Sequence, residues 1–306
     1  MQNFYQKTLN DEIKFQGIGL HSGVKVNLTI KPLKPNSGIT FKRVDIKNNN
    51  LIHADFKNVV DPILCTKIIN EHGVSVSTVE HLMAAFYGEG IDNALVEVDA
   101  PEIPIMDGSA VDFVDAIKSV GVEVQNQPRK FIKVLKKVEV KDGEKFISIE
   151  PLNQDLIIDF ELIFNNPLIR TRRKEFKLSN DDLAAIYNSR TFCLYEDIDS
   201  IKRMGLAKGG SLDNAVVVQG DKILNDDGLR NRHEFVYHKI LDCLGDIMLS
   251  GNRMFAHIKT SQGGHALTNK LLRKFFSNKD NWIYENYENN EKQNPNSYGN
   301  SVAISA

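Results

Sequence analysis

A histidine and an aspartate one helical turn apart lie in the segment from Arg232 to Asp246. Apolar residues recur through this segment with helical period and predict one buried face of a helix. On the opposite face Glu234, His238, Asp242 and Asp246 form a polar stripe, because residues four apart lie one turn above each other. An imidazole and a carboxylate in this arrangement can hold a divalent ion. A solvated helix face with a weak His–Asp pair explains the same spacing. Other segments of the chain must therefore decide between a metal site and a solvated face.

A second candidate ligand lies near the start of another predicted helix, within residues 76–87. Glu80 and His81 occupy its first turns, ahead of apolar residues at helical spacing. Ser77 and Glu80 fit a capping box, in which the glutamate only closes the helix N-terminus. No comparable structural role explains His81. A third histidine, His265, ends a glycine-rich loop over residues 260–265.

The elements that must position these residues are strands and helices in both halves of the chain. Residues 3–60 alternate with the period of strands and predict antiparallel sheet, interrupted by a tight hairpin at residues 16–23. We interpret His21, at the hairpin tip, as an ordinary turn residue. The helix at 76–87 precedes a strand at 91–98 and a helix that Ser109 caps and that runs to about Val120.

The second half repeats this outline after a polar, aperiodic stretch at residues 121–129, which we interpret as a linker. Strands are predicted at 131–140, 146–150, 156–163 and 215–218, and a short helix at 181–189. The tail after Asn281 is rich in Asn and Glu and predicts a surface loop before a last short strand at 301–305.

Composition limits the kinds of protein that this chain can be. With 306 residues, 42% of them hydrophobic, the sequence is long enough for two domains with separate cores. A net charge of −2 and the lack of a long basic block argue against nucleic acid as a partner. Three scattered cysteines offer no disulfide framework and suit a reducing compartment. We expect a soluble, cytoplasmic protein without a signal peptide or transmembrane segment.

Five motifs are more specific together than singly. They are Ser77-Thr-Val-Glu-His81, Ala100-Pro-Glu-Ile-Pro-Ile-Met-Asp-Gly-Ser109, Gly209-Gly-Ser211, His238-Lys-x-x-Asp-x-x-Gly-Asp246 and Gly264-His-Ala266. In this order and at these separations they closely resemble the UDP-3-O-acyl-N-acetylglucosamine deacetylases, zinc amidases that commit the lipid A pathway of Gram-negative bacteria. The resemblance covers nearly the whole chain. It implies an α+β fold of two similar domains, residues 1–126 and 127–306, each with mainly antiparallel sheets packed against a pair of helices, and an active site between them.

The resemblance also implies a metal site and a base. His81, His238 and Asp242 would bind one Zn²⁺ and leave a fourth position open, as a catalytic zinc site requires. Glu80 would act as the general base toward the attacking water, while the metal polarises the amide carbonyl. A purely structural zinc fits poorly, because two histidines and one acid without a thiolate cluster are not a structural set.

Other residues would stabilise charge or contact the substrate. The resemblance implies that Thr191 helps to hold the oxyanion and that His265, oriented and kept protonated by Asp246, protonates the leaving amine. An acyl-binding insert would span about residues 194–218, although its apolar residues could equally pack against the core. The residues implied to contact substrate are Lys239, Phe192, Leu20, Ile198, Ala207, Ser211, Ala215 and Val217.

The substrate implied is a UDP-glucosamine that carries an N-acetyl and a 3-O-hydroxyacyl group, and hydrolysis would release acetate. We expect a monomer. A rival interpretation is a metal-free module that binds a nucleotide or another protein, with Glu80 as a cap, His81 in the core and His238 on a wet surface. Metal content separates the two interpretations.

Overall fold

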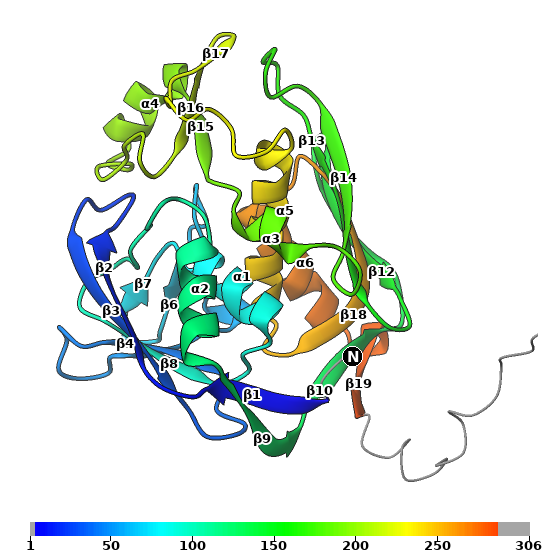
Figure 1. The fold of residues 1–306 in the computed structure, drawn as a ribbon. Coiled ribbons are helices and arrows are strands. Elements are labelled where there is room, and N and C mark those ends of the chain that lie inside the picture. The colour runs from blue at the N-terminus through cyan, green and yellow to red at the C-terminus, as the bar shows by residue number, and fades with distance from the viewer. Residues whose placement is uncertain (1–3, 287–306) are drawn as a thin grey trace, which may run out of the picture.

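Residues 4–286 are described by a computed structural model, which has a mixed α+β fold with several mainly antiparallel sheets (Figure 1). The predicted fold class is therefore confirmed. The four longer helices lie between the two larger sheets, one sheet from each half of the chain (Figure 1). Within the described part of the chain, no helix combines the length and apolar character needed to cross a membrane.

The first half forms a five-stranded sheet whose order is β2-β3-β8-β4-β5, with β4 and β8 parallel and the other neighbours antiparallel. Alternating burial along β3 follows the period of two that its sequence predicts. The elements are β2 (Ile13–Ile18), β3 (Lys25–Pro32), β4 (Ile39–Arg43), β5 (Leu51–His53), η1 (Phe56–Asn58), β6 (Ile68–Ile69), β7 (Ser75–Val76), α1 (Glu80–Glu89), β8 (Ala94–Val98) and α2 (Val111–Val120).

The second half forms a seven-stranded sheet around a central strand, β18, which is paired with β10, β12 and β13. Helices α5 and α6 pack on this sheet (Figure 1). The elements are β10 (Lys130–Val134), β11 (Val138–Asp142), β12 (Lys145–Pro151), β13 (Leu156–Leu162), β14 (Arg172–Lys177), α3 (Leu183–Tyr187), α5 (Glu234–Met248), β18 (Arg253–Ser261), α6 (His265–Phe276), η3 (Lys279–Asn281) and β19 (Trp282–Asn286).

A small third sheet lies at the top of Figure 1, apart from the two larger sheets. It contains part of the predicted acyl-binding insert, residues 194–218. Its strand order is β15-β16-β17, with β15 and β16 parallel. The elements are β15 (Phe192–Leu194), η2 (Tyr195–Asp197), α4 (Ile198–Arg203), β16 (Val216–Gln219) and β17 (Lys222–Ile223).

Three predicted boundaries are wrong. The supposed linker contains β9 (Val122–Pro128), which pairs with β1 (Tyr5–Leu9), so its residues belong to a two-stranded ribbon. The single strand predicted at 131–140 is two strands, β10 and β11. The tail that was predicted as a loop begins with β19, which pairs with β10. The short strand predicted at 301–305 lies outside the described residues.

Most of the buried apolar residues form one continuous cluster that includes both halves. The two halves thus share a continuous apolar interior, and the division into two domains at residues 126 and 127 stays a prediction. The halves are joined mainly where α1 packs against α5 (Figure 1). Phe86 of α1 and Leu241 of α5 are both fully buried members of this shared core.

Candidate metal centre and its surroundings

The backbones of α1 and α5 approach each other closely at Gly245. A Cβ atom at this position would lie 2.0 Å from the carbonyl oxygen of Glu80, so only glycine fits here. This approach places the start of α1 beside the polar stripe of α5. The imidazole rings of His81 and His238 lie 5.0 Å apart, at 82° to each other.

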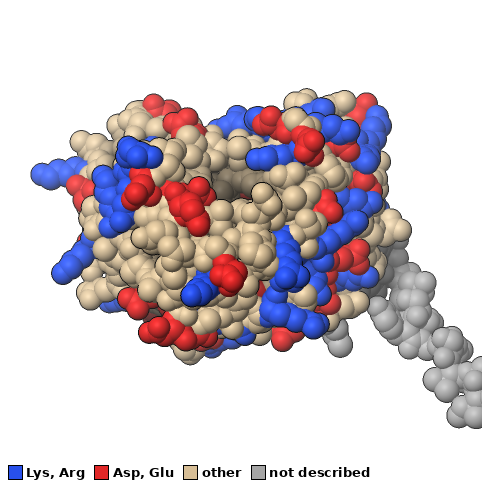
Figure 2. All heavy atoms as spheres, turned by 90° about the horizontal axis from the view of Figure 1, so that it is seen from above, with Lys and Arg blue, Asp and Glu red and all other residues tan. Residues whose placement is uncertain are grey.

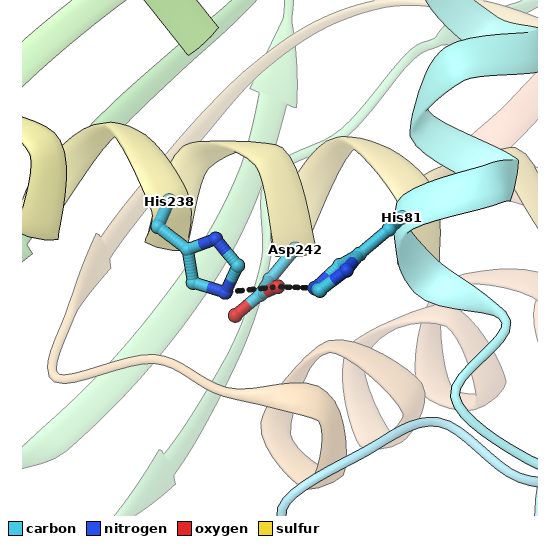
Figure 3. Close-up of side chains that lie close together, drawn as sticks. All are labelled: His81, His238 and Asp242. Atoms are coloured by element: carbon cyan, nitrogen blue, oxygen red, sulfur yellow. Dashed lines mark ion pairs between the residues drawn. The ribbon is translucent and has the colours of Figure 1, made fainter. Parts of the chain in front are cut away.

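His81, His238 and Asp242 form a compact group of metal-ligating side chains (Figure 3). Nε2 of His238 lies 3.3 Å and Nε2 of His81 lies 3.6 Å from Oδ1 of Asp242. All three residues are buried, and one ligand atom from each lies within 4.8 Å of the others. The polar stripe of α5 is therefore not a solvated face, and the rival placement of His238 on a wet surface is wrong.

The hydrogen bonds and the burial of His238 and Asp242 favour binding of a cation by this group. Nδ1 of His238 lies 3.0 Å from the carbonyl oxygen of Ser189, an arrangement in which Nδ1–H donates and Nε2 keeps its lone pair for the group. Burial lowers the pKa of His238 to about 3, which keeps the imidazole neutral. Oδ1 of Asp242 is buried without a hydrogen-bond donor among the described residues. Such an acceptor is costly unless a cation binds there, so the donor set fits a divalent metal.

Lys239 forms an ion pair with Asp242. Nζ of Lys239 donates to Oδ2 of Asp242 at 2.8 Å. Burial alone would raise the pKa of Asp242, but the imidazoles beside it and the positive charge of Lys239 hold it well below its usual range. The carboxylate is therefore ionised, and its Oδ1 remains available to a metal.

Glu80, Asp246 and His265 form a second group beside the first. Nε2 of His265 lies 3.7 Å from Oε1 of Glu80 and 4.0 Å from Oδ2 of Asp242, while its Nδ1 lies 2.9 Å from Oδ2 of Asp246. Burial opposes the charge of His265, but Asp246 and Glu80 outweigh it and raise the pKa of His265 to about 10. The imidazole is therefore a cation at neutral pH, with Nε2 directed toward Glu80.

Glu80 does not cap its helix. The N-cap of α1 is Val79, which makes no side-chain capping bond, and the hydroxyl of Ser77 donates to the carbonyl oxygen of Pro101 instead. The carboxylate of Glu80 accepts from the backbone N–H of Thr66 at 2.9 Å. Burial raises the pKa of Glu80. The capping-box interpretation is therefore wrong, and the carboxylate is free to act as a base.

Thr66 is a further residue of this group that no sequence motif indicates. Its hydroxyl lies 2.5 Å from Oδ1 of Asp246 and 3.0 Å from Nδ1 of His265, and its backbone N–H holds Glu80. Thr66 lies in a loop between η1 and β6 and belongs to no motif that we recognised. Only the fold brings it beside residues from α5 and α6.

The chain from Ser189 to Phe192 passes along the side of His238. Phe192 is half-buried, and its ring lies 6.4 Å from that of His238 and 5.6 Å from Nζ of Lys239. The backbone of Thr191 bonds with the N–H of Val216 and the carbonyl oxygen of Gly108. Thr191, Phe192 and Lys239 are therefore held on the side of the group that faces the small third sheet.

The hairpin between β2 and β3 has the predicted tight turn, but His21 at its tip is buried rather than exposed. Glu102 accepts from the backbone N–H of His21 and Ser22, which draws the tip inward. The carbonyl oxygen of Leu20 accepts from Gly209, so the hairpin is attached to the predicted acyl-binding insert.

The insert separates its apolar residues between two sides of β16. Val216 and Val218 are fully buried in the shared core, while Val217 and Ala215 are nearly buried but lie outside that cluster. Successive side chains of a strand point to opposite faces, so Val217 faces away from the core. Ile198 and Ala207 are half-buried and Ser211 is exposed. The face seen from above in Figure 2 is hollowed near its centre, and mostly uncharged residues border the hollow.

Comparison with known proteins gives the family. Residues 6–277 match the family described as UDP-3-O-acyl N-acetylglycosamine deacetylase. The chain is 43% identical to the UDP-3-O-acyl-N-acetylglucosamine deacetylase of Haemophilus influenzae (strain PittEE) over 290 residues, which are 94% of this chain and 95% of that relative. It is 44% identical to the enzyme of the same name from Actinobacillus succinogenes, with the same coverage, and 43% identical to that of Vibrio campbellii, with 94% of each chain covered. The chain therefore belongs to the UDP-3-O-acyl N-acetylglycosamine deacetylase family.

Proposed function

We propose that this protein is a zinc-dependent deacetylase that hydrolyses the N-acetyl group of UDP-3-O-(hydroxyacyl)-N-acetylglucosamine in lipid A biosynthesis. The observation that carries the proposal is the buried group of His81, His238 and Asp242 directly beside Glu80 and a cationic His265. The relatives' shared name supports the substrate. We further propose that the enzyme works in the cytoplasm as a monomer.

The metal would be held by Nε2 of His81, Nε2 of His238 and Oδ1 of Asp242. Two imidazoles and one carboxylate form the ligand set of a catalytic zinc site, with a position left open for water or substrate. When bound, zinc supplies a Lewis acid for the amide carbonyl and makes water more acidic. The hydrogen bond from His238 to Ser189 and the ion pair of Asp242 with Lys239 orient two of the three ligands.

Glu80 and His265 then divide the proton transfers between them. Glu80 accepts a proton at Oε1 as the water oxygen attacks the carbonyl carbon. The cationic His265 faces the oxygen that becomes negative and donates the proton on Nε2 to the amine nitrogen as the carbon–nitrogen bond breaks. Thr191 would supply a further hydrogen bond to that oxygen. Acetate and the free amine are the products.

The 3-O-acyl chain would lie along the outer face of the small third sheet. Val217 and Ala215 point away from the shared core, and Leu20 reaches this region through the bond between its carbonyl oxygen and Gly209. Burial of a fatty chain contributes roughly 0.8 kcal/mol per methylene, so a groove here would account for much of the affinity. Lys239 and Phe192 would contact the sugar, and Ile198, Ala207 and Ser211 would border the chain.

Zinc analysis combined with acetate release from the acylated UDP-sugar tests this function. We expect about one zinc per chain, and we expect His81→Ala to lose both metal and turnover. A metal-free preparation that still deacetylates the substrate at full rate would contradict the zinc dependence. A zinc-loaded protein that releases no acetate would contradict the substrate.

A further inference from the structure

A cavity of about 290 Å³ lies at the opposite end of α1 from the candidate metal centre. The last turn of α1, strand β1 and the starts of β10, β13 and β18 form its walls. Three cationic residues line it, namely Lys7, Arg129 and Arg253. None of the residues proposed to bind metal or substrate lines this cavity.

Two of these cations, Lys7 and Arg253, have no carboxylate within ion-pair distance among the residues that the structure describes. Arg129 is paired with Asp92 through Nε and Nη2 at 2.8 to 3.0 Å. Arg253 donates one N–H to the carbonyl oxygen of Tyr87, and its guanidinium carbon lies 4.4 Å from the centre of the Tyr87 ring. Its other N–H groups have no acceptor in the described part of the chain. Nζ of Lys7 likewise has no carboxylate within 4.0 Å among residues 4–286, although its backbone N–H bonds to Asp92.

The acidic residues in the cavity wall are already engaged. The carboxylate of Asp155 accepts from the hydroxyl of Ser179 at 2.7 Å, and that of Glu89 lies 3.8 Å from Nζ of Lys118. Burial, followed by the nearby guanidinium groups of Arg129 and Arg253, lowers the pKa of Lys7, while Asp92 and Glu89 oppose this shift.

We propose that this cavity binds a small phosphate-bearing anion through Lys7 and Arg253. Two unpaired cations match a phosphate dianion in charge, and a guanidinium with free N–H groups matches its oxygens in geometry. The rings of Phe131 and Phe255, stacked 4.8 Å apart, form one wall of the cavity and would contact the organic part of a phosphate ester. The bound anion would join β1 to β18 across the end of α1, independently of the proposed deacetylase activity.

Inorganic phosphate is the probe for this site. We expect phosphate to raise the melting temperature of the full-length protein beyond sodium chloride at equal ionic strength, because a ligand that binds only the folded state stabilises it. Titration calorimetry should give a phosphate affinity that Lys7→Met weakens at least about tenfold, since the stem remains and the charge is lost. Lys7→Arg should retain most of the affinity. Acetate, a monoanion, should bind more weakly than phosphate.

Two control variants locate the binding. Lys14→Gln removes an exposed lysine that is paired with Glu12 and should leave the phosphate response unchanged. Lys239→Gln removes the lysine beside the candidate metal centre and should leave it unchanged as well. Equal phosphate affinity in the native protein and in Lys7→Met would overturn the proposal, as would a response lost in Lys239→Gln or no response beyond that to chloride.

Discussion

The hydroxyl of Thr66 lies 2.5 Å from Oδ1 of Asp246 and 3.0 Å from Nδ1 of His265, which is itself 2.9 Å from Oδ2 of the same aspartate. The three side chains close a ring in which Thr66 can donate to Asp246 while it accepts from His265. Thr66 is fully buried, so water cannot replace its hydroxyl. The orientation of the proposed acid therefore depends on a residue that does not itself reach the substrate.

We expect Thr66→Val to lower kcat about 10- to 100-fold, because one hydrogen bond to an ionised group is worth about 1.5 to 3 kcal/mol. KM and zinc content should change little, since the backbone N–H that binds Glu80 remains. Thr66→Ser keeps the hydroxyl and should recover most of the rate. Steady-state kinetics of both variants test this role, and equal losses in Val and Ser variants would assign Thr66 to packing alone.

Glu80→Gln should preserve the fold and abolish the proposed base. Glutamine can still accept from the backbone N–H of Thr66, so the melting temperature should stay close to that of the native protein. Removal of a general base typically costs about 10²- to 10⁴-fold in rate. Acetate release and thermal unfolding measured on one preparation check both statements. A Gln variant with normal turnover would show that Glu80 is not the base.

Activity should depend on pH as a bell. Its rising limb follows loss of the proton from Glu80, whose pKa burial raises, and its falling limb follows loss of the proton from His265 near its pKa of about 10. Asp246→Asn removes a negative charge that raises the pKa of His265, so the falling limb should move to lower pH by about one unit or more. Profiles of kcat/KM for the native protein and Asp246→Asn test this, and an unchanged falling limb would contradict the assignment to His265.

Gly245→Ala should separate α1 from α5. The added Cβ would lie 2.0 Å from the backbone carbonyl oxygen of Glu80, which cannot move by a side-chain rotation. Overpacking of this kind typically costs about 1 to 3 kcal/mol. We expect a lower free energy of unfolding and weaker metal binding, because His81 and His238 lie on different helices. Gly264→Ala is the matched control, since no atom lies within 4 Å of its added Cβ. Denaturant unfolding and zinc titration of both variants give the comparison.

Val217→Trp should distinguish an acyl groove from a packing face. If the chain lies along this side of β16, the larger ring should raise KM for the acylated substrate much more than for the same sugar without its 3-O-acyl group. A loss of stability without a change in this selectivity would place the chain elsewhere. Val216→Trp, on the core side of the same strand, is the control and should destabilise the fold through overpacking.

The sequence alone was enough to predict the fold class, and several residues that it singled out, among them His81, His238 and Asp242, lie together in the structure. The helical period of apolar residues predicted α5. The residues that lie beside His238 were predicted from the family resemblance, which rests on the order and spacing of five short motifs. The sequence did not predict the features that depend on contacts between residues far apart in the chain. Polar residues 122–128 form β9 only because β1 lies beside them, and Thr66 joins Asp246 only through the tertiary fold. The capping box at Ser77 was wrong because Glu80 bonds to Thr66 instead.

The division of the metal ligands between α1 and α5 also has a consequence for biosynthesis of the protein. Every strand from β8 to β17 is translated between His81 and His238. A nascent chain that ends before α5 carries a single imidazole of the group and an apolar α1 without its partner helix. We therefore expect zinc to enter only after the ribosome has released α5, and we expect shorter chains to depend on chaperones. Ribosome-bound chains stalled with α5 still inside the ribosome, and chains long enough for α5 to have emerged, would test this order when both are assayed for zinc.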